Sequence, residues 1–134
     1  MKRTLLKSKI HMAHVTEANL TYYGSISIDK KLCDAANLVP FERVEIYNCN
    51  NGARFATYVI LGDDGEICLN GAAARHVQKN DVVIIASYAE FEEEELQTHN
   101  PDLVFVNQSN YIQEIRKYID SSINKADALA EPTV

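Results

Sequence analysis

Short stretches of alternating apolar and polar residues, separated by tight turns, recur along most of this chain. Such alternation places successive side chains on opposite faces and is typical of half-buried β-strands. The turn Asn50-Asn51-Gly52 predicts a β-hairpin, because Asn-Gly supplies the positive φ values of a type I′ turn. We expect strands over residues 5–15, 20–28, 44–49, 54–61, 66–69, 82–86 and 103–106. Many short strands with little helix predict an all-β barrel.

The strands differ in how much of their surface they should bury. In the first strand the two expected faces are Leu6, Ser8, Ile10 and Met12 on one side and Lys7, Lys9, His11 and Ala13 on the other. Lys9 and His11 then share a face that is open either to solvent or to a site. The continuous apolar run 82–86 predicts a strand buried on both faces. Residues 16–19 are expected to form a turn.

Two segments favour helix. Asp29 is a suitable N-cap for a short helix that ends near Asn37. From residue 110 the apolar residues up to Ile123 fall at helical spacing, which predicts a C-terminal helix packed on the barrel or on a neighbouring subunit. The acidic run 90–95 predicts a solvated loop or helix face, and residues 126–134 a frayed tail. We therefore expect one barrel domain over 1–117, followed by a helix and tail over 118–134.

Charge and cysteine content exclude several classes of protein. A net charge of −6 with a pI of about 5.1 argues against a nucleic-acid binder. No apolar stretch is long enough for a membrane helix or a signal peptide, so a cytoplasmic protein is expected. Cys33, Cys49 and Cys68 are widely spaced and predict small buried side chains rather than disulfides. His11 and His14 lack a third ligand at suitable spacing, so no metal site is expected.

The dipeptide Gly24-Ser25 interrupts the strand expected over 20–28. Glycine inside a strand is unfavourable by roughly 0.5–1 kcal/mol, so its presence calls for a reason. One interpretation is an ordinary bulge or turn. The other is an unusual backbone geometry that lets the Ser25 hydroxyl reach the carbonyl carbon of Gly24.

Three further segments carry polar residues that a barrel core does not require, namely 9–11, 54–58 and 70–74. Small side chains over 70–74 leave backbone N–H groups accessible, either to a ligand or to close packing. In a regular strand Thr57 and Tyr58 point to opposite faces. Both can serve one site only if the strand bends or ends there.

Taken together, these segments resemble the pyruvoyl-dependent aspartate 1-decarboxylase family. The resemblance covers roughly residues 1–117 and is specific as a set of motifs. The matching residues are Lys9, His11, Tyr22-x-Gly24-Ser25, Asn51-Gly52-x-Arg54-Phe55-x-Thr57-Tyr58, Asn70-Gly71-Ala72-Ala73-Ala74 and the run 81–86. The family fold is a double-psi β-barrel assembled as a homotetramer with sites between subunits. Tyr23 and Thr21 stand at positions that vary in the family.

The resemblance implies a chain that cuts itself between Gly24 and Ser25. Attack of the Ser25 hydroxyl, elimination and hydrolysis would leave a covalent pyruvoyl group at position 25, with Thr57 donating to the oxyanion. The pyruvoyl carbonyl would take the amino group of L-aspartate as an imine and accept the electrons left by carbon dioxide. The product would be β-alanine, a precursor of pantothenate and coenzyme A.

Individual roles follow from the same resemblance, residue by residue. Arg54 and Lys9 match carboxylate-binding cations, and Tyr58 matches the proton donor. The other positions that match the pocket are Asn70, Gly71, Ala72, Ala73, His11 and Tyr22. No separate coenzyme, metal, membrane or nucleic acid is implied, and the sequence does not say whether a maturation factor acts.

Two other classes of function remain open from the residues alone. A β-barrel of this size can be a non-catalytic binding module, although this would leave Lys9, Arg54, Thr57 and Tyr58 unexplained. A self-processing serine hydrolase would need a His and a carboxylate beside Ser25, which spacing does not decide. The decarboxylase predicts two fragments on a gel, one ending at Gly24 and one beginning at a blocked position 25, and this distinguishes it from both.

Overall fold

The computed structural model describes residues 1–117, in which nine strands dominate and helical segments are short. The all-β prediction is therefore confirmed. The strands are β1 (Lys2–His14), β2 (Glu17–Asn19), β3 (Ser25–Asp29), β4 (Arg43–Asn48), β5 (Arg54–Gly62), β6 (Ile67–Asn70), β7 (Val82–Glu92), β8 (Asp102–Val106) and β9 (Ile112–Lys117). The helical segments are α1 (Lys30–Ala35) and the 3₁₀ helices η1 (Gly71–His76) and η2 (Glu93–Gln97).

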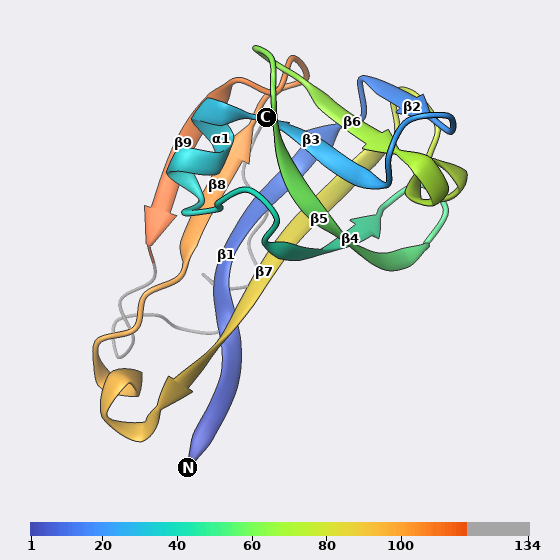
Figure 1. Cartoon of the computed structure of the whole chain (residues 1–134). Helices are drawn as coiled ribbons and strands as arrows, with labels where there is room; N and C mark the ends of the chain where they lie inside the picture. The colour runs from blue at the N-terminus through green and yellow to red at the C-terminus, as the bar shows by residue number, and fades with distance from the viewer. Residues whose placement is uncertain (118–134) are drawn as a thin grey trace.

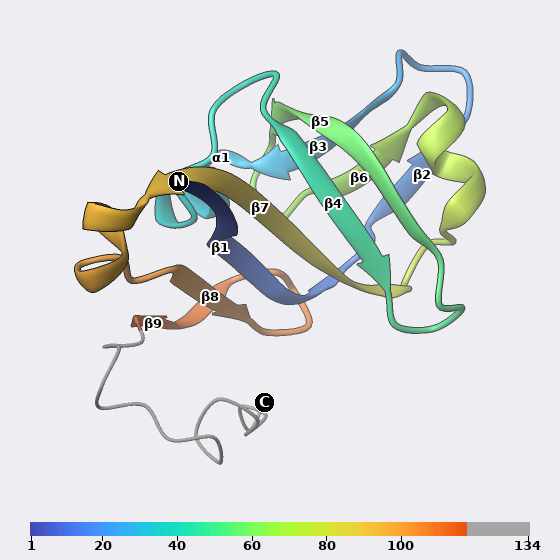
Figure 2. The ribbon, with the colours of Figure 1, turned by 90° about the horizontal axis from the view of Figure 1, so that it is seen from below.

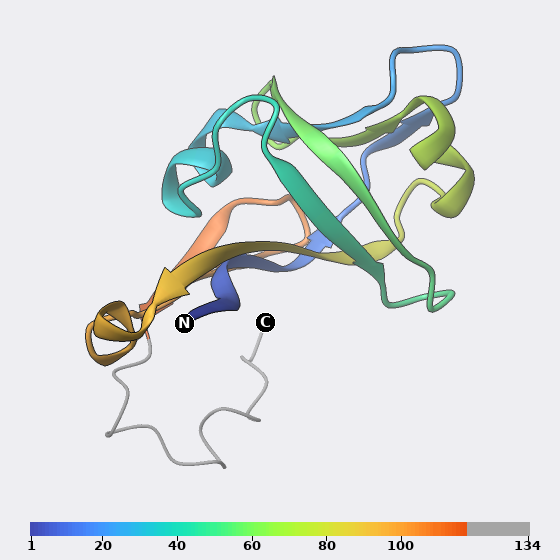
Figure 3. The same cartoon turned by 60° about the horizontal axis from the view of Figure 1, so that its bottom comes forward.

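The nine strands form one curled sheet in the order β2-β6-β3-β5-β4-β7-β1-β8-β9. The ladders β1/β8, β2/β6 and β3/β5 are parallel and the others antiparallel. Figure 1 shows β1 and β7 as a long pair that extends, with η2 and the N-terminus, away from the other strands. Figures 2 and 3 show β4 and β5 crossing between this pair and the strands β3 and β6. This order is compatible with a double-psi barrel, which stays a prediction.

Aliphatic side chains from most strands meet in one core. Its largest fully buried members are Ile10, Ile26, Ile28, Leu32, Ile46, Ile67, Leu69 and Ile85. On β3 and β6 these residues alternate with the buried polar residues Ser25, Ser27 and Asn70. The two faces of this part of the sheet therefore differ, since one is apolar and the other is hydrogen-bonded.

The face pattern predicted for the first strand is interrupted at two irregularities of the ladder, the first between Leu6 and Ser8 and the second after Ile10. The register of β1 against β7 shifts between Ile10 and Ala13, and Met12 has a φ of 62°. Because an extra residue in a bulge exchanges the two faces, His11 and Ala13 are both buried. The interpretation that the face of Lys9 and His11 is open to solvent is therefore wrong for His11, whose side chain is buried.

Asp29 caps α1 as predicted, because its carboxylate accepts a hydrogen bond of 2.8 Å from the Lys31 backbone N–H. The same carboxylate accepts from the Gly65 N–H at 2.8 Å, which ties the turn 62–65 to the helix. The hairpin at Asn50–Gly52 is also confirmed. Only Gly52 has a positive φ there, so the four-residue loop 49–52 replaces the expected type I′ turn.

The chain around Gly24 departs from the predicted strand over 20–28. Residues 20–24 form a loop, and β3 begins at Ser25. The expected turn over 16–19 contains the short strand β2, which pairs with β6. The side chain of Asn19 accepts hydrogen bonds from the N–H and hydroxyl of Thr21, and so favours the turn out of β2.

The helix predicted from residue 110 is wrong over the residues that the structure describes. Residues 112–117 form β9, which folds back antiparallel on β8. The turn before β9 is held by Asn110, whose buried amide donates to the carbonyls of His14 and Gly65 at 2.8 and 2.9 Å. These tertiary contacts override the helical spacing of the apolar residues. The rest of the predicted helix and the tail, 118–134, lie outside the described residues.

Three smaller predictions have mixed outcomes. Cys33 and Cys68 are buried as expected, but Cys49 is exposed because it begins the hairpin loop. Ile84 is half-buried, so the run 82–86 is less covered than predicted. The acidic run is largely exposed as expected, but only residues 93–95 lie in the helix η2, whereas residues 90–92 end the strand β7. Within residues 1–117, no helix is long and apolar enough to cross a membrane.

Candidate active site

The peptide bond between Gly24 and Ser25 lies where an exposed loop meets a buried strand. Gly24 is exposed, and a Cβ added to it would meet nothing within 4 Å. Ser25 is only 1% exposed and opens β3. The carbonyl side of this peptide is therefore accessible, whereas the serine side chain is held inside the protein.

Two cross-strand pairs surround the Ser25 side chain. In the β3/β6 ladder Ser25 lies opposite Asn70, and Ser27 lies opposite Cys68. The Asn70 amide nitrogen donates to Ser25 Oγ at 2.9 Å and to Ser27 Oγ at 3.0 Å. The Cys68 thiol donates to Asn70 Oδ1 at 3.2 Å. All four side chains are thus joined on one face of the sheet.

The thiol in this network stays protonated. Burial, followed by the nearby carboxylates of Glu17 and Glu66, raises the pKa of Cys68 to about 11. Cys68 is therefore a hydrogen-bond donor at neutral pH, not a nucleophilic thiolate.

Gly71 presses its backbone against Gly24. A Cβ at Gly71 would lie 2.6 Å from Gly24 Cα and 2.7 Å from Gly24 N. Gly71 also has a φ of +63°, which residues with a side chain rarely adopt. Both observations require glycine here, and its place at the start of η1 brings this helix against the loop 20–24.

The parallel β3/β5 ladder places Thr57 and Tyr58 beside the same peptide. The first pair of this ladder is Ile26 with Val59. Because the strands are parallel, Tyr58 lies level with Ser25 one residue earlier, and Thr57 level with Gly24 two residues earlier. Exposure alternates along β5 from Arg54 to Val59, so the side chains of Thr57 and Tyr58 do point to opposite faces. Tyr58 is 37% exposed and its ring lies against that of Phe41 at 6.2 Å.

Arg54 lies at the opposite end of this strand segment. It is four residues from Tyr58, roughly 13 Å along an extended strand. Its guanidinium carbon lies 3.9 Å from the ring centroid of Tyr47, its cross-strand partner. Burial, and then a hydrogen bond with Tyr88, raise the pKa of the Tyr47 hydroxyl. Arg54 is thus held over a neutral ring on an exposed face.

Neither Lys9 nor His11 lies on a strand next to that of Ser25 in the sheet. Lys9 pairs with Ala86, Ala86 with Glu45, and Glu45 with Ala56, which places Lys9 three strands from β5. Three strand spacings amount to about 14 Å. The buried His11 ring packs edge-on against Phe105, with ring centroids 5.4 Å apart.

A surface groove of about 290 Å³ runs along the hydrogen-bonded face beside Ser25. Its lining residues are Glu17, Asn19, Tyr22, Ser27, Ile60, Leu61, Gly62, Asp63, Glu66, Cys68 and Asn70. Of the pocket residues predicted from sequence, Tyr22 and Asn70 line this groove, and Ala72 and Ala73 lie next to Gly71 in η1. Ser27 and Cys68 were missed, although each stands two positions from a predicted site residue.

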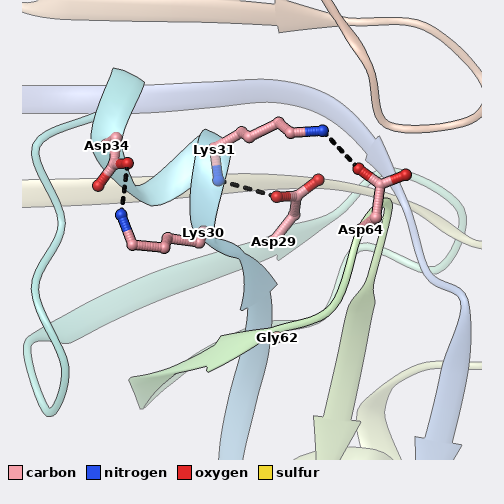
Figure 4. Close-up of a pocket in the computed structure, with 6 residues that line it drawn as sticks. All are labelled: Asp29, Lys30, Lys31, Asp34, Gly62 and Asp64. Carbon is pink, nitrogen blue, oxygen red and sulfur yellow. Dashed lines mark hydrogen bonds and ion pairs between the residues drawn. The ribbon is translucent and has the colours of Figure 1, made fainter.

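A second depression lies beside α1 and adjoins this groove at Gly62, which lines both (Figure 4). Its charged side chains pair with one another, Lys30 with Asp34 at 2.9 Å and Lys31 with Asp64 at 2.7 Å. These ion pairs lower the pKa of Asp64 and raise those of both lysines. Within residues 1–117, no group of three or more His, Cys, Asp or Glu side chains is placed to hold a metal ion.

Fold and site together describe an all-β protein with a glycine–serine peptide held between a tight backbone contact and a buried amide. The family model described as aspartate decarboxylase matches residues 1–113. This chain therefore belongs to the aspartate decarboxylase family.

Curated relatives agree with this assignment. An aspartate 1-decarboxylase of Bdellovibrio bacteriovorus is 59% identical over 117 residues, 87% of this chain and 94% of the relative. One of a Hydrogenobaculum species is also 59% identical, with the same coverage. One of Listeria monocytogenes is 55% identical over 117 residues, 86% of this chain and 92% of the relative.

Proposed function

We propose that this chain is a self-processing enzyme that decarboxylates L-aspartate to β-alanine and carbon dioxide. The family and the names of its relatives support the reaction. The observation that carries the proposal is the environment of the Gly24–Ser25 peptide, in which Asn70 holds Ser25 Oγ and Gly71 presses on Gly24. The β-alanine would serve pantothenate and coenzyme A synthesis, and we expect the enzyme in the cytoplasm.

The surroundings of position 25 fit a pyruvoyl group derived from the serine. The side chain is buried, so a ketone there would be shielded from solvent. The Asn70 amide donates to Ser25 Oγ, the oxygen that leaves with Gly24 when the group forms. A methyl ketone is also no larger than the serine it would replace.

Formation of the group starts with attack of Ser25 Oγ on the Gly24 carbonyl carbon. A bond forms between these atoms, the hydroxyl proton ends on the Ser25 amide nitrogen, and the C–N bond breaks to give an ester. Loss of the Cα proton to water then breaks the Cβ–Oγ bond, which leaves a Gly24 carboxylate and dehydroalanine. One water is consumed and one ammonia is released in the last hydrolysis. We assign Thr57, at the level of Gly24 in the ladder, as the donor to the oxyanion.

In the decarboxylation, the pyruvoyl carbonyl supplies an electron sink for the bond that carbon dioxide leaves. The remaining roles belong to side chains and backbone of this protein. We assign Arg54 and Lys9 to the substrate carboxylates, since a guanidinium binds a carboxylate with two parallel hydrogen bonds. Tyr58 lies at the level of Ser25 and would return a proton to the product carbon. Gly71, Ala72 and Ala73 would hold the substrate through backbone N–H groups.

The distance between Lys9 and Ser25 within one chain supports an assembly with shared sites. Lys9 and His11 lie on β1, three strands from β5, and so reach a Ser25 site more readily from a second copy. We therefore propose a homotetramer in which β1 of one subunit completes the site of another. Mixing Lys9→Ala and Ser25→Ala chains would test this, because mixed assemblies should recover activity that neither variant has alone.

One gel and one mass measurement test the main proposal. Purified protein should convert to two fragments, one ending at Gly24 and one starting with a blocked residue that lacks the serine hydroxyl and amine. Ser25→Ala should stay a single inactive chain. A wild-type chain that stays whole yet releases carbon dioxide from aspartate would refute the mechanism. A chain that neither cleaves nor decarboxylates would support a non-catalytic binding module.

A further inference from the structure

Ser27 and Cys68 contact the processing site without taking part in its bond changes. They form the cross-strand pair next to Ser25 and Asn70. Ser27 is 7% and Cys68 4% exposed, so both side chains are removed from bulk water. Buried polar groups of this kind are normally hydrogen-bonded, and both bond to the Asn70 amide.

The Asn70 amide can be placed in two ways that differ by exchange of its oxygen and nitrogen. In the structure Oδ1 accepts from the Cys68 thiol, and the two N–H groups go to Ser25 and Ser27. Exchange would replace the S–H···Oδ1 hydrogen bond by an N–H directed at the thiol sulfur, which is only a weak acceptor, and would leave the thiol the longer contact of 3.9 Å with the Leu69 carbonyl. The thiol therefore selects the orientation in which Asn70 donates to Ser25, and Ser27 accepts the second amide hydrogen.

This orientation determines the role of the reacting oxygen. Because Ser25 Oγ accepts from Asn70, its own proton is directed elsewhere, and the structure places the Tyr23 carbonyl 3.3 Å away as acceptor. When the Cβ–Oγ bond later breaks, Oγ keeps the electron pair as one oxygen of the Gly24 carboxylate. The Asn70 N–H would then donate to a charged oxygen, and such hydrogen bonds are about twice as strong as neutral ones.

We propose that Cys68 and Ser27 are positioning residues for self-processing, which orient the Asn70 amide so that it donates to Ser25 Oγ. This inference rests on the proposed function, since it concerns the cleavage that forms the reactive group. Neither residue exchanges a proton or forms a bond during cleavage. Their effect should therefore appear in the rate of chain cleavage, without a change in its products.

The test is a time course of cleavage of freshly purified precursor, followed by gel and by intact mass. Cys68→Ala removes the donor to Oδ1 and should slow cleavage about tenfold to a hundredfold, the effect expected if the released Asn70 amide no longer donates to the oxygen that becomes charged. Cys68→Ser keeps a donor at the same position and should return the rate to within about threefold of wild type. Ser27→Ala should slow cleavage about tenfold, and Ser27→Thr, which keeps the hydroxyl, should recover it.

Cys33→Ala provides the matched control for loss of a buried thiol. Cys33 lies in the core and its thiol points to the Ile28 carbonyl, away from the Asn70 network. This variant should cleave at the wild-type rate even if its unfolding temperature falls as much as that of Cys68→Ala. Equal slowing in both variants would mean that cleavage responds to general loosening, and would overturn the inference.

The outcomes separate this inference from the proposed function. If wild type does not cleave, the proposed function itself fails. If wild type cleaves and a folded Cys68→Ala variant cleaves equally fast, only the positioning role fails. Should Cys68→Ala not fold, the serine pair decides, because Ser27→Ala must be slow and Ser27→Thr fast for the inference to stand.

Discussion

Replacement of Gly71 by alanine should stop self-processing by displacing the peptide that is cut. The added methyl group would lie 2.6 Å from Gly24 Cα, well inside contact distance. A left-handed backbone at a residue with a side chain costs about 1–2 kcal/mol. Overpacking against the fixed loop adds about 1–3 kcal/mol. Relief of the clash must move Gly24, and a displacement of about 1 Å can slow a positioned reaction about a hundredfold.

Gly52→Ala is the matched control for this substitution. Gly52 has a φ of +78°, close to that of Gly71, but a Cβ there meets nothing within 4 Å. Both variants share the backbone penalty, and only Gly71→Ala adds the clash. We expect Gly52→Ala to cleave at the wild-type rate, with an unfolding temperature about 4–8 °C lower if each kcal/mol lowers it by about 4 °C.

The assay follows the uncut fraction over hours on a denaturing gel and measures thermal unfolding of each precursor. Gly71→Ala should remain uncut at times when wild type and Gly52→Ala are fully processed. Cleavage of Gly71→Ala at the wild-type rate would refute the reasoning, because it would show that the contact with Gly24 does not position the peptide.

Three further outcomes are expected. Tyr58→Phe should still cleave, but its release of carbon dioxide and β-alanine should fall by about 10²–10⁴-fold, the range for loss of a general acid. Burial alone would raise the pKa of Glu42, but the hydrogen bonds from Lys7 and Ser87 outweigh burial, and the pKa lies below its usual value. The ionised Glu42 therefore stabilises the fold above about pH 4.5, and this stabilisation is lost on acidification. Glu42→Gln should therefore lower the free energy of unfolding by about 1–2 kcal/mol at pH 7 in urea titrations, and by less at pH 3. Burial raises the pKa of the Cys33 thiol from 9.0 to about 11. The free energy of unfolding should therefore keep the full contribution of the neutral thiol below pH 9 and fall by up to about 2.7 kcal/mol as the pH rises to 11. Cys33→Ala should not show this loss.

Alternation predicted the strands wherever one face is buried and the other is not. It predicted β4 and the first part of β5, where exposure alternates residue by residue as far as Val59. Helical spacing of apolar residues was the wrong signal for β9, where side chains on both faces are exposed and pairing with β8 determines the structure. Asn107 and Asn110 were a turn signal there, because the Asn107 side chain accepts from the N–H of Ser109 and Asn110 adopts a φ of 65°, which asparagine tolerates better than most residues.

The composition of the site could be inferred from motifs, but its arrangement could not. Ser27 and Cys68 stand two residues from Ser25 and Asn70, so a shared face was foreseeable along each strand. The register that places the two strands opposite each other is a tertiary property, set by packing of the core. The parallel ladder that brings Thr57 and Tyr58 to Ser25 has the same origin.

The place of β1 in the sheet has a consequence for the mature protein. Cleavage after Gly24 would leave β1 and β2 on a short fragment, yet β1 lies between β7 and β8, both contributed by the long one. The two pieces would then be interleaved and could separate only by global unfolding. Refolding of a single processed subunit would then require two fragments to meet, so formation of its sheet should depend on fragment concentration, whereas the sheet of an uncut subunit can form from one chain before any assembly.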